Sequence, residues 1–280
     1  MSRTEKRRKS PFVDAETLIA KPNGNRLFVD VRLGEPDVEL EKFRDGHIFG
    51  AVHAQIRDVF AAQPTAHSGN LPLPCLEDLR VTLEAWGVDA QTEIVLYGPT
   101  LALAARGWWV LRWAGLEHVS VLEGGLRAWT AAGGPVARGN GPRRRAGAAR
   151  LLPLSPGNLA DIDTNAVNRR SDAVVLLDAR DEAAYQAGHI SGALNAPASD
   201  LWTPSGELRP ERVIASQYAN AGVLPDREVI VYCGGGVLSA LSWMTLAEAG
   251  VPVRLYVGSW SEWYKLKDQR QVSAKAGGEA

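Results

Sequence analysis

Cysteine is scarce in this chain of 280 residues, where only Cys75 and Cys233 occur. Two cysteines far apart in the sequence cannot form the disulfide framework of a small secreted protein. Their scarcity fits a reducing compartment, so we expect a cytoplasmic protein.

An excess of one charge, clusters of metal ligands and long apolar segments are also lacking. The 31 Lys and Arg residues nearly balance the 32 Asp and Glu residues, giving a net charge of −1, and this predicts no nucleic-acid partner. The five histidines show no ligand spacing, so we expect no metal site. No apolar run is long enough to cross a bilayer, and we therefore expect no membrane partner.

Cys233 stands where a predicted strand meets a predicted helix. The apolar segment 228–232 is typical of a buried strand, Gly234-Gly235-Gly236 of a tight loop, and 237–249 of a helix. Backbone N–H groups of a glycine-rich loop at a helix N-terminus form an anion cradle. A thiol held there ionises readily, which predicts that Cys233 is a nucleophile. Most free cysteines are small buried hydrophobes instead, and this is how we interpret Cys75.

The chain also contains an internal repeat, in which four motifs recur in the same order. They are Asp30-Val-Arg32 with Asp178-Ala-Arg180, Gly46-His47-Ile48 with Gly188-His189-Ile190, Glu93–Gly98 with Glu228–Cys233, and Gly124-Gly125 with Gly258-Ser259. A shared order of this kind indicates a tandem duplication of one domain. Two domains also agree with the length of the chain.

The alternation of short apolar runs with helical patterns predicts the α/β class. We expect two tandem domains, each a mainly parallel sheet with helices on both faces. The first domain is predicted over 11–135, a linker over 136–157 and the second domain over 158–270. The linker includes the run Arg143-Arg144-Arg145, which we interpret as solvated rather than as a site for an anionic partner.

Taken together, these motifs resemble the tandem-domain rhodanese family of thiosulfate and 3-mercaptopyruvate sulfurtransferases. The resemblance implies two tandem rhodanese-like domains, of which the first is non-catalytic because Gly98 stands where the second has Cys233. It implies that Cys233 takes sulfur from a small-molecule donor, holds it as a persulfide and passes it to cyanide or a thiol. No cofactor is expected.

The resemblance also implies the residues that bind the substrate. The loop amides would stabilise the anionic persulfide, and they belong to Gly234, Gly235, Gly236, Val237 and Leu238. Arg180 matches an arginine that lies near the substrate anion, although a structural pair with Asp178 or Glu182 explains it equally well. Trp260 is a candidate wall of the pocket.

The donor is harder to assign, because the chain departs from both family patterns. Rhodanese proper carries basic residues after the cysteine, where this chain has Gly234 and Gly235. Mercaptopyruvate enzymes carry a serine, a threonine and a second arginine where this chain has Gly235, Leu238 and Ala184. We expect thiosulfate to be the donor, with 3-mercaptopyruvate as the alternative.

Two other classes of function share some of these features. A low-turnover persulfide carrier or binding module needs the same cysteine and loop. A cysteine phosphatase of the same fold would need an arginine at the position of Ser239, and the loop contains none.

Overall fold

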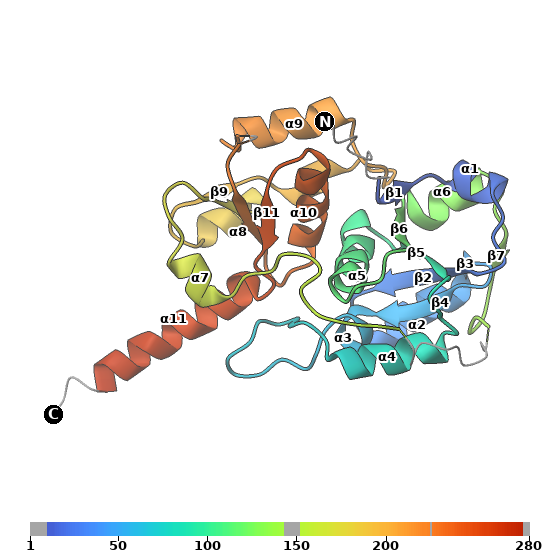
Figure 1. Ribbon diagram of the computed structural model, residues 1–280, viewed down its shortest axis with the longest axis horizontal. Helices are drawn as coiled ribbons and strands as arrows, with labels where there is room; N and C mark the ends of the chain where they lie inside the picture. The colour runs from blue at the N-terminus through green and yellow to red at the C-terminus, as the bar shows by residue number, and fades with distance from the viewer. Residues whose placement is uncertain (1–9, 143–151, 225, 277–280) are drawn as a thin grey trace, which may run out of the picture.

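The computed structural model describes residues 10–142, 152–224 and 226–276, with side chains as far as residue 267. Arg143-Arg144-Arg145 lies outside the described residues. Figure 1 shows two α/β units side by side, each built around its own parallel sheet. The predicted fold class is therefore confirmed.

The first half forms a five-stranded parallel sheet in the order β1-β6-β5-β2-β4, together with a small antiparallel pair of β3 and β7. Its strands are β1 (Phe12–Val13), β2 (Arg26–Arg32), β3 (His47–Ile48), β4 (Val52–Gln55), β5 (Glu93–Tyr97), β6 (Val119–Leu122) and β7 (Val136–Ala137). Its helices are α1 (Ala15–Ala20), α2 (Pro36–Asp45), α3 (Ile56–Val59), α4 (Leu76–Ala85), α5 (Leu101–Trp113) and α6 (Gly125–Ala131).

The second half forms a four-stranded parallel sheet in the order β11-β10-β8-β9. Its strands are β8 (Val175–Asp178), β9 (Ala193–Asn195), β10 (Val229–Tyr232) and β11 (Val253–Leu255). Its helices are α7 (Thr164–Asn168), α8 (Glu182–Ala187), the 3₁₀ helix η2 (Ala198–Leu201), α9 (Glu211–Asn220), α10 (Leu238–Glu248) and α11 (Ser259–Ala276).

The strands β5 and β10 lie inside their sheets and are buried on both faces, which explains their continuous apolar sequences. In β10, Val229 and Val231 enter one hydrophobic cluster while Ile230 and Tyr232 enter another. Successive side chains of a strand point to opposite faces, so helices must cover both sides of the sheet. The predicted arrangement of helices on both faces follows from this pattern.

The two halves share one continuous hydrophobic cluster, in which α5 packs against α10 (Figure 1). The ring of Trp243 lies 6.1 Å from that of Trp108 and 6.4 Å from that of Trp109. The helix that follows the Cys233 loop is therefore packed against the first domain rather than exposed between two separate units.

The segment between the two domains contacts the first domain at both of its described ends. Ile48 and Val136 pair across β3 and β7, so the first two residues assigned to the linker continue the structure of the first domain. Further along, the backbone N–H of Ser155 donates to the carbonyl of Ala114 at the end of α5.

Across the described residues, no helix has the length and apolar character needed to span a membrane.

Candidate active site

Cys233 lies at the carboxyl end of β10, where the chain turns into α10. The side chain is buried, with 1% of its surface exposed. Gly236 closes the turn at φ +84°, and a Cβ there would lie 2.8 Å from the Val257 carbonyl oxygen and 2.9 Å from Nη1 of Arg106. Only glycine combines this left-handed conformation with such close neighbours, so the loop can fold back over the thiol.

Two donors point at the Cys233 sulfur. The backbone N–H of Gly236 lies 3.1 Å from Sγ, and the hydroxyl of Ser239 lies 3.3 Å from it. Gly236 lies just before α10 and Ser239 lies in its first turn, where the helix dipole favours negative charge. The arrangement is therefore suited to holding a sulfur anion.

Ser259, the first residue of α11, fixes the backbone of the cysteine. Its Oγ accepts the N–H of Cys233 at 3.2 Å and donates to the carbonyl of Tyr256 at 2.9 Å. It is the only non-glycine residue of the described chain with a positive φ, +55°. A serine in this left-handed conformation is strained, and its two buried hydrogen bonds hold it there.

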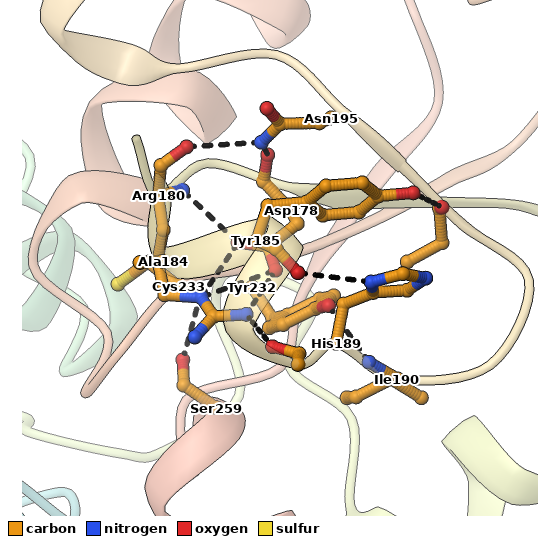
Figure 2. A network of polar contacts seen from close by, with 12 residues as sticks. Asp178, Arg180, Ala184, Tyr185, His189, Ile190, Asn195, Tyr232, Cys233 and Ser259 are labelled. Atoms are coloured by element: carbon orange, nitrogen blue, oxygen red, sulfur yellow. Dashed lines mark hydrogen bonds and ion pairs between the residues drawn. The ribbon is translucent and has the colours of Figure 1, made fainter. Parts of the chain in front are cut away.

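Arg180 is held by a network of polar contacts beside Cys233 (Figure 2). Its Nη2 lies 2.6 Å from the fully buried carboxylate of Asp178 and also donates to the carbonyl of Gly188. Burial acts to lower the pKa of Arg180, but the hydrogen bonds and the charge of Asp178 outweigh it and raise that pKa. In Figure 2 the sulfur of Cys233 lies at the edge of this network, pointing away from His189.

Trp260 joins the cysteine loop to this arginine. Its backbone N–H donates to the carbonyl of Cys233 at 2.9 Å, and its ring lies 4.8 Å from the guanidinium carbon of Arg180. The ring also stacks on Trp263 at 5.4 Å. The indole therefore covers Arg180, whose side chain keeps 10% of its surface exposed.

The first domain reaches the site through the segment 68–71. The backbone N–H of Asn70 donates to the Ser261 hydroxyl at 2.9 Å, and a Cβ on Gly235 would lie within van der Waals distance of Asn70 and Leu71. A Cβ on Gly69 would lie only 2.5 Å from the carbonyl oxygen of Gly258, which explains the glycine at this approach. One side of the Cys233 loop is thus covered by the other domain.

A model of the rhodanese-like domain matches this chain twice, at residues 14–132 and 163–266. The chain belongs to the tandem-domain rhodanese family. It is 35% identical to the "Probable 3-mercaptopyruvate sulfurtransferase" of Pseudomonas aeruginosa over 89% of this chain and 92% of that one. It is also 32% identical to the "Putative thiosulfate sulfurtransferase SseB" of Mycobacterium tuberculosis, over 85% of this chain and 86% of that one.

Among solved structures, the rhodanese fold of this chain resembles the 3-mercaptopyruvate sulfurtransferase SseA from Escherichia coli. The TM-score is 0.76 at 30% sequence identity, and the match covers 91% of this chain and all of the other. Both halves of the duplication are therefore present in the relative, in the same arrangement along the chain.

The first rhodanese domain has no room for a nucleophile at the position that matches Cys233. A Cβ on Gly98 would lie 2.4 Å from the carbonyl oxygen of Val31. Cys75 does not fill the core as a small hydrophobe, because it is exposed at the N-cap of α4. This corrects the interpretation made from the sequence, which rested on the general tendency of free cysteines to be buried.

The predicted loop amides differ in their relation to the sulfur. Within the described residues, Gly236 alone donates a backbone hydrogen bond to Sγ. The other predicted residues form the rest of the loop and the start of α10 without such a bond, and they are Gly234, Gly235, Val237 and Leu238. Their role toward the outer sulfur of a persulfide stays a prediction, as do the substrate contacts of Arg180 and Trp260.

Three polar residues of this site were not predicted from the sequence. Ser239 was considered only as the place where a phosphatase would have arginine, and Ser259 only as part of a repeated motif. Arg106, in the first domain, lies outside the repeated motifs, and only the alignment of the two repeats, which places Leu241 at its position, sets it apart. In the described part of the chain, no group of three or more His, Cys, Asp or Glu side chains is placed to hold a metal ion.

Proposed function

We propose that this sulfurtransferase uses Cys233 as the sulfur-carrying nucleophile and takes its sulfur preferentially from 3-mercaptopyruvate. The observation that supports the nucleophile is the pair of donors on its buried sulfur, at 3.1 Å from Gly236 and 3.3 Å from Ser239. A thiol that receives two hydrogen bonds at a helix N-terminus is favoured as the anion.

The first half-reaction transfers one sulfur atom to the enzyme. The Cys233 thiolate attacks the thiol sulfur of the donor, an S–S bond forms and the C–S bond breaks. The electron pair of that bond leaves on carbon as the enolate of pyruvate, which takes up a proton. With thiosulfate the same attack would break the S–S bond of the donor and release sulfite.

The second half-reaction returns the enzyme to its starting state. Cyanide or a thiol attacks the outer sulfur of the persulfide, the S–S bond breaks, and its electron pair stays on Cys233 as the thiolate. The products are thiocyanate or a new persulfide. Two separate half-reactions through a covalent intermediate predict ping-pong kinetics.

The choice of donor revises the expectation drawn from the sequence, which was thiosulfate. The names of the relatives favour 3-mercaptopyruvate, since the Pseudomonas aeruginosa protein and the Escherichia coli structure both carry it. The chemistry of the loop is compatible with this choice. No Lys or Arg lies in Gly234–Leu238 to balance the two charges of thiosulfate, whereas 3-mercaptopyruvate has one carboxylate for Arg180.

Thiosulfate remains the second candidate donor, because a relative of similar identity carries that name. The test compares kcat/KM for the two donors on the same purified protein, with cyanide as acceptor. A higher value for 3-mercaptopyruvate supports the proposal, and a higher value for thiosulfate overturns the assignment of the donor. A persulfide detected by mass spectrometry without turnover would indicate a carrier instead.

A further inference from the structure

The first domain places a buried cation beneath the Cys233 loop. Arg106 lies on α5 and none of its surface is exposed. Its Nη2 donates to the carbonyls of Phe60 at 3.0 Å and Leu71 at 2.9 Å, and its Nη1 makes a long contact of 3.5 Å with the carbonyl of Gly236. One guanidinium therefore joins two segments of its own domain to the loop of the other.

The charge of Arg106 has no carboxylate partner in the described part of the chain. No Asp or Glu oxygen of those residues lies within ion-pair distance of it, and its buried Nε has no hydrogen-bond partner among them. Burying a charge without a counter-charge is strongly unfavourable. Burial lowers the pKa of Arg106 to about 10, and the negative charge of Cys233 acts in the opposite direction. Gly236 links the two groups, because its carbonyl contacts Nη1 of Arg106 and its N–H donates to the Cys233 sulfur.

The repeat shows that the arginine is not a requirement of the helix. Segments 93–115 and 228–250 align without a gap, and this alignment places Leu241 of α10 where α5 has Arg106. Both side chains are fully buried. An apolar residue fills this position in one copy, so the charge in the other calls for a separate explanation.

We propose that Arg106 is a positioning residue that supplies the counter-charge of the catalytic sulfur from the non-catalytic domain. The inference rests on the proposed function, in which the sulfur of Cys233 is the nucleophile. The reaction alternates between a thiolate and a persulfide, and both forms carry one negative charge when ionised. A single fixed cation can therefore balance the sulfur throughout the cycle without moving.

Other charged groups near the loop are already engaged. Asp178 and Arg180 neutralise each other in a buried pair. Glu262 of α11 accepts hydrogen bonds from Thr164 and from the backbone of Gly69. Arg106 is therefore the group whose removal changes the net charge facing the sulfur without separating an ion pair.

The experiment measures alkylation of Cys233 by iodoacetate, an anion, and by iodoacetamide, which is neutral, across a range of pH. The Arg106→Met variant removes the charge with little change in size, and Arg106→Lys keeps it. Arg112→Met is the matched control, since Arg112 lies on the same helix and donates to the carbonyl of Leu116 instead. Thermal unfolding checks that each variant folds.

In Arg106→Met we expect the ratio of iodoacetate to iodoacetamide rates to fall about tenfold, because the local positive potential is lost. The pH at which alkylation is half-maximal should rise by about one unit or more. Arg106→Lys should keep the ratio within about threefold of the unsubstituted protein, and Arg112→Met should match that protein. A folded Arg106→Met variant with an unchanged ratio and an unchanged midpoint would overturn the proposal.

Two further arms keep the test decisive. If Arg106→Met does not fold, Arg106→Gln replaces it, because glutamine is neutral but can still donate to the two carbonyls. If neither neutral variant folds, the lysine variant decides, and a loss greater than threefold in the ratio overturns the role of the charge. Alkylation needs no sulfur donor, so an enzyme that forms no persulfide would contradict the proposed function without affecting this measurement.

Discussion

In the first half of the chain Arg32 pairs with Asp30, and in the second half Arg180 pairs with Asp178 in the same way. The histidines repeat this correspondence. His47 bonds the carbonyl of Phe43 and stacks on its ring at 3.9 Å, while His189 does the same with Tyr185, also at 3.9 Å. The Asp–Arg pair and the stacked histidine form a frame that recurs in a half without a nucleophile, and this frame is therefore a structural feature of the domain.

The halves differ at a few positions around this frame. Gly98 and Gly125 of the first half correspond to Cys233 and Ser259 of the second. Cys233 adds the thiol, and Ser259 adds the hydroxyl that accepts the backbone N–H of Cys233. The arginines differ as well. Arg32 has a second carboxylate 3.6 Å away, from Glu39, whereas Arg180 lies against the ring of Trp260.

The two halves therefore have separate roles. In the first half Arg32 has a second carboxylate nearby, and the domain approaches the Cys233 loop through segment 68–71 and Arg106. In the second half Arg180 is paired with one carboxylate and lies against the ring of Trp260, while its exposed fraction of 10% is nearly the same as the 9% of Arg32. Only the second half thus has a cysteine at this position, and the first half covers one side of its loop.

The largest expected effect comes from removing the nucleophile. Cys233→Ser should lower the rate of sulfur transfer by about a thousandfold or more, because no persulfide can form. Steady-state assays with both donors measure this loss. Cys75→Ser is the matched control, since Cys75 is exposed in the first half, and its rate should be unchanged. Substantial activity in Cys233→Ser would place the reaction elsewhere in the molecule.

A cysteine placed in the first half should not create a second active site. In Gly98→Cys the new Cβ would lie 2.4 Å from the Val31 carbonyl, so we expect a loss of about 1–3 kcal/mol in the free energy of unfolding. Gly24→Cys is the control, because nothing lies within 4 Å of a Cβ there. Denaturant unfolding measures both. A Gly98→Cys protein as stable as the control, with a persulfide on the new thiol, would show that the first domain is only one substitution from activity.

Ser259 tests the backbone difference between the halves, since Gly125 has a similar φ of +52°. Ser259→Ala keeps a Cβ at positive φ and removes the hydroxyl, whereas Ser259→Gly removes the hydroxyl and the strain together. We therefore expect the alanine variant to unfold with about 1 kcal/mol less free energy than the glycine variant. Equal stabilities would mean that the left-handed conformation carries no strain. Both variants should transfer sulfur more slowly, because the Cys233 N–H loses its acceptor.

The smallest expected effect concerns Glu123, which stands where the second half has Val257. Burial and nearby carboxylates raise its pKa above the ordinary value, although the N–H of Leu208 acts in the opposite direction. The folded protein therefore binds this proton more tightly than the unfolded chain, and the ionised group costs stability as the pH rises through the raised pKa. Glu123→Gln should raise the free energy of unfolding at pH 7 by less than about 1 kcal/mol. This gain should shrink toward pH 4, and a gain independent of pH would rule out the half-buried ionised carboxylate as its cause.

Much of the fold could be predicted from local patterns. The predicted strand 228–232 corresponds to β10, and the predicted helix 237–249 corresponds to α10. These elements were visible because continuous apolar runs and glycine loops are encoded within a few residues. The short strands β3 and β7 were not predicted, since two-residue pairs depend on a partner far away in the chain.

The sequence by itself determined the duplicated α/β frame and the position of Cys233 in a glycine loop between a strand and a helix. Both are consequences of neighbouring residues, whose periodicity and backbone freedom do not depend on the rest of the molecule. The tertiary structure alone decided which groups surround the Cys233 loop: Ser259 from the start of α11, and segment 68–71 and Arg106 from the other domain. These residues are distant in the chain, and only the packing of α5 against α10 brings a buried charge to a thiol more than a hundred residues away.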